Sequence, residues 1–170
     1  MRHPEKVWIG PKYEEQRIFV LGESWYGEFS DELVTDDGYI NAYLAGQQVD
    51  AMYTRIANAC RLPKAEFWNA VLFTNFVQCV GSTRDNRPTV ENYREASGRL
   101  SALLELHKPA GVWILGIGQS VYSAPIVQNA GIPHETSAHP TSYGLKNLTL
   151  GDSWRRLLGK VSSQAQKNDA

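Results

Sequence analysis

The stretch Ile18-Phe-Val-Leu-Gly-Glu-Ser24 decides the fold class. Its first four residues are apolar, two of them are β-branched, and a glycine ends the run. A short, continuous apolar run of this kind is typical of a strand that is buried on both faces, as the strands of a parallel sheet are. Further strands are predicted at Val71–Val77, Val112–Leu115 and Ile132–Ala138. Together they indicate a parallel sheet that is covered on both sides.

Helical segments separate the predicted strands. Their apolar side chains recur at the spacing of one helical face, and Thr89 is a suitable N-cap for one of them. The predicted helices cover Ala42–Arg61, Thr89–His107, Gln119–Ala130 and a last segment around Trp154, Leu157 and Leu158. This alternation predicts an α/β fold, namely a three-layer α/β/α sandwich with a central, mostly parallel, four-stranded sheet. We expect one domain over residues 1–161 and a polar, flexible tail over residues 162–170.

Composition excludes several classes of protein. The chain has 170 residues, 42% of them hydrophobic, and a formal net charge of −1, so neither wholesale disorder nor a generally basic, nucleic-acid-binding coat is expected. Two cysteines, Cys60 and Cys79, are too few for a disulfide framework or a zinc ribbon. No apolar run reaches the length of a membrane span, and the first residues do not resemble a signal peptide. We therefore expect a monomeric protein of the cytoplasm with no cofactor, no metal site and no membrane partner.

Polar residues follow each predicted strand. Glu23 comes after the first strand, Asn75 lies in the second, Gly116-Ile-Gly118 follows the third, and His139 follows the fourth. The carboxyl ends of parallel strands meet at one edge of a sheet, where such folds bind ligands. Each residue also has an ordinary explanation: a surface carboxylate, an amide that satisfies backbone groups, a tight turn and a loop histidine. Their convergence nevertheless predicts a site at this edge.

The sequences of these segments resemble those of the uracil-DNA glycosylase superfamily. They are most similar to the family-four enzymes, which carry an iron–sulfur cluster. Ile18–Ser24 resembles the family's first motif, an apolar strand followed by Gly-Glu-Ala-Pro-Gly. Thr74–Cys79 and Asn86–Glu91 are similar to its central stretch. Lys108–Gly116 looks like its third strand, and Ser137–Thr141 looks like its His-Pro-Ser motif. The likeness runs from about Arg17 to Leu158 in collinear order.

Several positions depart from the family pattern. The family's N-terminal cysteine pair is absent and only Cys79 matches a cluster ligand, so no cluster is expected. Trp25-Tyr26 stands in place of Ala-Pro-Gly, and Thr141 stands in place of serine but keeps a hydroxyl group. The family's base-stacking phenylalanine has no clear match. Asn41 falls near that position, with Tyr39 and Tyr43 beside it.

The resemblance implies a monofunctional DNA glycosylase of base-excision repair. Such an enzyme flips a uracil or another deaminated base out of the helix and hydrolyses its N-glycosidic bond, releasing the free base. Glu23 and His139 would be the catalytic pair: the carboxylate faces the sugar cation, and the imidazole bonds the leaving base. Asn75 would read the base, and Tyr26 or Tyr39 would stack on it. The predicted base-binding residues are Gly22, Ser24, Tyr26, Tyr39 and Asn75.

Contacts to DNA are predicted mainly in the loop after His139. Tyr143 and Leu145 are candidates for the wedge that fills the space of the flipped nucleotide. The predicted DNA-binding residues are Arg84, Arg87, Thr141, Ser142, Tyr143, Leu145 and Lys146. Two alternatives stay open. One is a catalytically silent module of the same fold that binds a base or damaged nucleic acid, and the other is a Rossmann-like enzyme that binds a small nucleotide at Gly116–Gly118.

Overall fold

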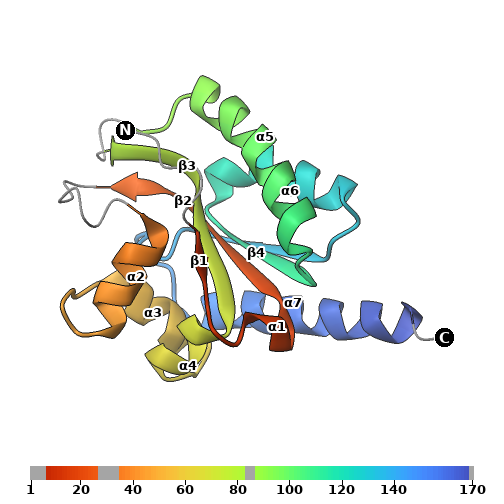
Figure 1. Cartoon of the computed structure of the whole chain (residues 1–170), viewed down its shortest axis with the longest axis horizontal. Helices are drawn as coiled ribbons and strands as arrows, with labels where there is room; N and C mark the ends of the chain where they lie inside the picture. The colour runs from red at the N-terminus through yellow and green to blue at the C-terminus, as the bar shows by residue number, and fades with distance from the viewer. Residues whose placement is uncertain (1–6, 27–34, 83–86, 169–170) are drawn as a thin grey trace.

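The computed structural model describes residues 7–26, 35–82 and 87–168, and describes only the backbone for Tyr26, residues 79–82 and Asn168. Figure 1 shows a central sheet with helices on both faces. The elements in chain order are β1 (Trp8–Ile9), α1 (Tyr13–Gln16), β2 (Ile18–Tyr26), α2 (Asp36–Leu44), α3 (Ala51–Ala59), α4 (Lys64–Asn69), β3 (Val71–Ser82), α5 (Val90–His107), β4 (Gly111–Leu115), α6 (Ile117–Asn129), β5 (His134–Ser137) and α7 (Asn147–Asn168).

The sheet has five strands in the order β1-β3-β2-β4-β5. Strands β3, β2, β4 and β5 are parallel, as expected. The prediction of four strands was wrong, because β1 adds an antiparallel strand at the edge of β3 through the pairs Trp8↔Phe73 and Ile9↔Leu72. With only two residues, β1 is too short to show a period in the sequence.

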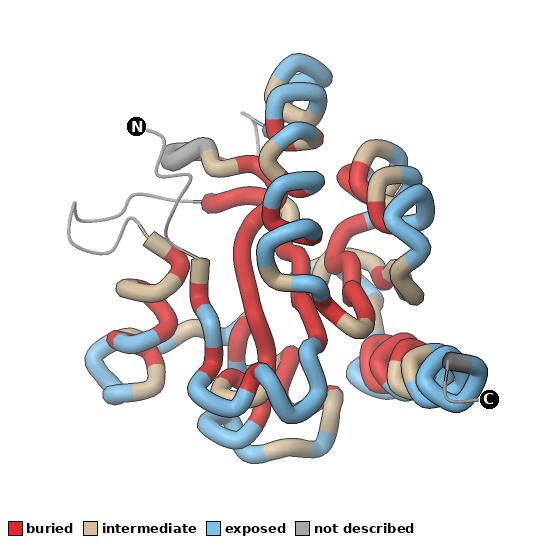
Figure 2. The backbone as a smooth tube through the Cα atoms, turned by 45° about the vertical axis from the view of Figure 1, so that its right-hand side comes forward, coloured by how far each residue is buried: buried red, intermediate tan, exposed pale blue. Residues whose placement is uncertain are grey.

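Strand β2 lies in the middle of the sheet and packs on both faces. Ile18 and Val20 belong to a core cluster with α2, α3, α4 and α7, whereas Phe19 and Leu21 belong to a second cluster with α5 and α6. All four side chains are essentially inaccessible to solvent. Figure 2 shows the resulting band of buried backbone along the sheet. This two-sided burial is the reason that the run in the sequence is continuously apolar.

The predicted helix Ala42–Arg61 is two helices in the structure. Helix α2 ends at Leu44, and the turn that follows holds Gly46 at a φ of +77°. Asp50 then caps α3, because its carboxylate accepts a hydrogen bond of 2.9 Å from the backbone N–H of Tyr53. A residue at positive φ and a new N-cap both interrupt a helix, although the apolar spacing continues across them.

Helix α5 begins and ends where the sequence predicts. The Thr89 side chain accepts a bond from the Asn92 backbone, the Asn92 side chain bonds back to the Thr89 backbone, and Lys108 follows the last helical residue in the left-handed conformation. The polar segment expected to form the tail is helical as far as Asn168, because α7 continues to that residue. Gln164 Nε2 donates to the carbonyl of Gly131 at 3.2 Å, which fixes this extension to the loop before β5. Within the described residues, no helix is long and apolar enough to cross a membrane.

Candidate functional site

The candidate site lies at the carboxyl ends of β2 and β4. From β2 the chain goes to β3 on one side, and it then returns past β2 to β4 on the other side. In an α/β sheet, such a change of direction opens a crevice outside the carboxyl ends of the two central strands. Glu23 in β2 and the start of α6 after β4 both lie here. A Cβ atom built on Gly118 would be 3.2 Å from Glu23 Oε1, and one built on Gly116 would be 3.5 Å from the Glu23 Cβ. A side chain at Gly118 would therefore crowd the Glu23 carboxylate by a few tenths of an ångström, whereas one at Gly116 would be in ordinary contact with Glu23.

Tyr93 of α5 holds the Glu23 carboxylate in place. Its hydroxyl donates a hydrogen bond of 2.9 Å to Glu23 Oε1. The Tyr93 ring is stacked on both sides, with ring centroids 6.1 Å from Phe76 and 4.8 Å from Tyr122 and interplanar angles of 19° and 14°. Sequence reasoning missed Tyr93, because nothing near it in the chain distinguishes it from an ordinary aromatic residue on a helix.

His139 follows β5, and its protonation state can be read from its contacts. Its Nδ1 atom lies 2.8 Å from the hydroxyl oxygen of Thr141 and accepts a bond of 3.3 Å from the Thr141 backbone N–H. A backbone N–H can only donate, so Nδ1 is the acceptor and the ring hydrogen is on Nε2. Burial lowers the pKa of His139, and the negative charge of Glu23 acts in the opposite direction. The structure thus brings Glu23 and a neutral, Nε2-protonated His139 together.

Asn75 lies beside Gly22, its register partner on β2. A Cβ on Gly22 would be 2.3 Å from Asn75 Oδ1. The Asn75 amide can therefore lie where it does only because residue 22 is a glycine. Asn75 is 3% exposed, and its Nδ2 atom donates to Asp36 Oδ1 at 3.4 Å. Asp36 is fully buried, and this burial raises its pKa to about 7, against the opposing effects of the Thr74 hydroxyl, the Arg99 charge and other donors.

Arg55 of α3 organises the loop between His139 and α7. Its guanidinium donates to the carbonyl oxygens of Pro140 and Leu145, and its Nε donates to Asn147 Oδ1 at 2.8 Å. Leu145 is half-buried and packs against the core. Tyr143, by contrast, is fully exposed at the turn. Arg55 has no recognisable signal in the sequence, because its three partners lie 85 or more residues away in the chain.

Other predicted site residues lie in different surroundings. Tyr39 is part of the core: its hydroxyl donates to Asp50 at 2.9 Å, and its ring contacts Trp25 and Tyr53 edge-to-face at 5.3 and 5.5 Å. Ser24 is buried on β2. Among the loop residues, Thr141 binds the His139 ring as described, Ser142 is half-buried and Lys146 is exposed, as is Arg87 before α5. Arg84 and the side chain of Tyr26 lie outside the described residues.

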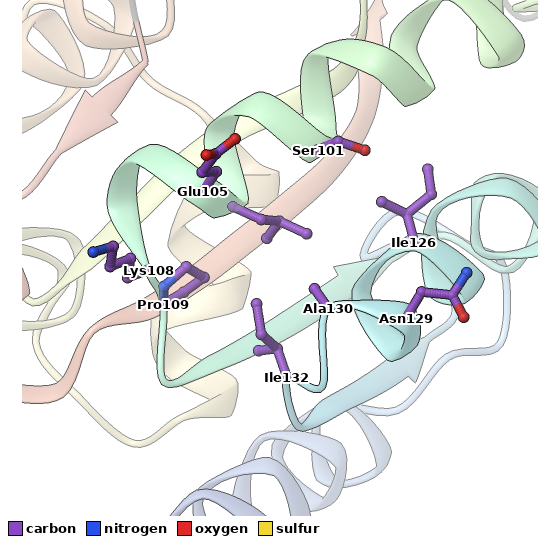
Figure 3. Close-up of a pocket in the computed structure, with 9 residues that line it drawn as sticks. Ser101, Glu105, Lys108, Pro109, Ile126, Asn129, Ala130 and Ile132 are labelled. Carbon is purple, nitrogen blue, oxygen red and sulfur yellow. The ribbon is translucent and has the colours of Figure 1, made fainter.

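Two grooves lie away from this site. One, of about 580 Å³, is shown in Figure 3 and lies between the C-terminal ends of α5 and α6, at the amino ends of β4 and β5. It is lined by Ser101, Leu104, Glu105, Lys108, Pro109, Ile126, Asn129, Ala130 and Ile132. The other, of about 860 Å³, lies along α7 and contains Arg156, Lys160 and Lys167. Both are at the end of the sheet opposite to Glu23 and His139.

No known family model matches the chain, and no curated protein is significantly similar to it. In the part of the chain that the structure describes, no group of three or more His, Cys, Asp and Glu side chains is arranged to hold a metal ion. The residues at the carboxyl edge of the sheet offer a carboxylate, a neutral imidazole N–H donor and an amide.

Proposed function

We propose that this protein is a DNA glycosylase that hydrolyses the N-glycosidic bond of uracil or another deaminated base, as its resemblance to the uracil-DNA glycosylase superfamily implies. The observation that carries the proposal is the pair formed by Glu23 and the neutral His139 at the carboxyl ends of the central strands. The four parallel strands and the positions of Gly22, Asn75 and Thr141 along the chain support it further.

The chemistry needs both members of the pair. When the bond between C1′ and the base nitrogen breaks, its electrons go to the base, the sugar becomes a cation of oxocarbenium type, and water then adds to C1′. The Nε2–H of His139 donates a hydrogen bond to the carbonyl oxygen on which the negative charge of the base develops. The carboxylate of Glu23, which Tyr93 orients at 2.9 Å, stabilises the sugar cation or orients the water. The products are free base and an abasic site.

Thr141 acts in this scheme through His139 rather than through DNA. Because its backbone N–H occupies Nδ1 of the ring, the hydrogen stays on Nε2, where it is needed as a donor. The lowered pKa of His139 keeps the ring neutral at pH 7. Activity then declines toward acidic pH, as the ring gains a second proton and its uncharged form is lost.

Asn75 provides the means to choose the base. An amide has an acceptor oxygen and a donor nitrogen in one plane, which matches the N3–H and O4 of uracil. Cytosine has an acceptor and a donor at the corresponding positions and would leave buried polar groups unpaired, which is a strong basis for rejection. Hypoxanthine and xanthine have the same edge as uracil, so a deaminated purine is a second possible substrate class.

Tyr143 is the better of the two wedge candidates. Extrusion of a nucleotide leaves a gap in the base stack that a protruding side chain can fill. Tyr143 is fully exposed, whereas Leu145 packs on the core and its carbonyl oxygen binds Arg55. Lys146 and Arg87 are exposed cations that can contact phosphates. With a net charge of −1, the protein should bind DNA modestly and with strong salt dependence.

The test is alkali cleavage of labelled oligonucleotides that contain uracil, hypoxanthine, xanthine or only normal bases, in single- and double-stranded form. His139→Ala is the active-site variant, and His134→Ala, at the other end of β5, is its matched control. We expect base-specific cleavage that disappears in His139→Ala and persists in His134→Ala. Absence of cleavage by the folded wild-type protein would refute the proposal and would favour a silent binding module.

A further inference from the structure

A buried carboxylate lies at the edge of the sheet beside Asn75, and the proposed reaction does not use it. Asp36 is the first residue of α2 and is fully buried. The edge strand β1 pairs with Leu72 and Phe73, so the next residues of β3, Thr74 and Asn75, lie beyond that pairing. Asp36 fills this position and faces the polar side chains of β3.

Three side chains of β3 donate to the Asp36 carboxylate. The Thr74 hydroxyl and Gln78 Nε2 donate to Oδ2, the latter at 3.4 Å, and Asn75 Nδ2 donates to Oδ1 at 3.4 Å. An ionised carboxylate can only accept hydrogen bonds. It therefore holds the NH₂ group of Asn75 toward α2 and leaves the Asn75 oxygen facing Gly22 on β2, the strand that carries Glu23. The reversed amide would place two acceptor oxygens against each other.

We propose that Asp36 is a positioning residue that fixes the orientation of the Asn75 amide and thereby sets which hydrogen-bond pattern the site accepts. The orientation itself follows from the contacts, whereas its effect on base selectivity rests on the proposed glycosylase function. With Asp36 in place, Asn75 presents an acceptor oxygen and its second N–H, the pattern that pairs with uracil and rejects cytosine.

The groups around Asp36 make the orientation of the Asn75 amide depend on pH. Arg99 of α5 donates to the backbone carbonyl of Asn75 at 3.2 Å and to the Thr74 hydroxyl at 2.9 Å. The positive charge of Arg99 favours the ionised form of the Asp36 carboxylate. Tyr53 of α3 also faces Asp36, and burial raises the pKa of its phenol well above 10, so it stays neutral. Since burial raises the pKa of Asp36 to about 7, the carboxylate gains a proton just below neutral pH. The acid can then donate to the Asn75 oxygen and permit the reversed amide.

The first test follows the side-chain amide of Asn75 by ¹⁵N–¹H NMR from about pH 5 to about pH 9, the range that brackets the shifted carboxyl. The signal pair is assigned by its absence from Asn75→Asp. In the wild type we expect the chemical shifts of this pair to change with pH, with a midpoint near the Asp36 pKa. In Asp36→Asn we expect them not to change with pH. Asp37→Asn is the matched control, because it removes the neighbouring carboxylate in the same helical turn and should leave the titration unchanged.

A wild-type pair that does not move, or one that moves equally in Asp36→Asn, would overturn the inference. If Asp36→Asn does not fold, the wild type and Asp37→Asn still decide it, because an immobile wild-type pair refutes the coupling and a pair that also stops moving in Asp37→Asn assigns it to the wrong carboxylate. Neither result depends on catalysis.

The second test measures the ratio of uracil to cytosine excision in the same variants. Asp36→Asn should lower this ratio by about tenfold, the effect of losing one ordinary hydrogen bond that fixes the amide, and Asp37→Asn should not change it. A ratio unchanged in Asp36→Asn, in an otherwise active protein, would refute the link to selectivity. A wild-type protein that excises no base would refute the proposed function, and the NMR titration would still decide the role of Asp36.

Discussion

Replacing Asp36 with asparagine should change how the stability of the protein depends on pH. In the unfolded chain this carboxyl has its ordinary pKa of 3.8, and in the folded protein burial raises the pKa to about 7. Between these values the folded state holds a proton that the unfolded state has lost. This contribution to stability is therefore fully present below the unfolded pKa and is lost as the pH rises through the folded pKa.

The size of the effect follows from the two pKa values. Each unit of difference corresponds to about 1.4 kcal/mol. Between pH 5 and pH 8 a shift from 3.8 to about 7 should remove about 2.5 kcal/mol from the free energy of unfolding of the wild type. Asp36→Asn keeps the size of the side chain but does not ionise, so its stability lacks this component.

Urea denaturation of both proteins at the two pH values measures the effect. The quantity of interest is the unfolding free energy of the wild type minus that of Asp36→Asn, because titrations that both proteins share cancel in the difference. We expect this difference to fall by about 2 to 3 kcal/mol from pH 5 to pH 8. A difference that stays constant would show that Asp36 has its ordinary pKa in the folded protein, and a difference that rises would show that the pKa is not raised; either result would refute the reasoning.

Three further substitutions test the geometry of the site. Gly22→Ala should slow uracil excision by about 100-fold, because the added Cβ would displace the Asn75 oxygen. A slower rate in single-turnover kinetics, at unchanged thermal stability, would confirm this prediction, and a wild-type rate would contradict it. Tyr93→Phe should lower kcat about tenfold through loss of one bond to a carboxylate, with KM for the oligonucleotide unchanged as the sign that binding is intact. Arg55→Ala should cost about 2 kcal/mol of stability and increase amide hydrogen exchange between residues 139 and 147; unaltered exchange there would exclude its role in holding the loop.

Local patterns in the sequence predict the parts of the fold that local interactions determine. Burial on both faces makes β2 and β4 continuously apolar, and the capping box at Thr89 fixes the start of α5. The edge strand β1 is different, since its two residues are held by pairing with β3 more than 60 positions away. The break between α2 and α3 depends on one turn within an unbroken apolar spacing. Neither feature produces a periodic pattern of apolar residues that is long enough to be recognised in the sequence.

The proximity of Glu23 and His139 was predictable from their places along the strands. Glu23 lies toward the carboxyl end of β2 and His139 follows β5, with β4 between the two strands, so the parallel topology brings both residues to the same edge of the sheet. Tyr93, Arg55 and Asp36 could not be found in this way. Each is recognised by a side-chain contact to a partner at least 38 positions away, and the residue types by themselves indicate only a helix surface.

The glycines at Gly116 and Gly118 bear on the choice between the candidate functions. In the sequence they resemble part of a phosphate-binding turn at the start of a helix. In the structure the Glu23 side chain lies against this turn, and its Oε1 is 3.2 Å from the position of a Gly118 Cβ. A helix N-terminus favours an anion, and here the protein itself supplies one. A nucleotide phosphate bound at this turn would meet the negative charge of Glu23, so the geometry disfavours the Rossmann-like enzyme. It favours a reaction in which a fixed carboxylate faces a developing positive charge.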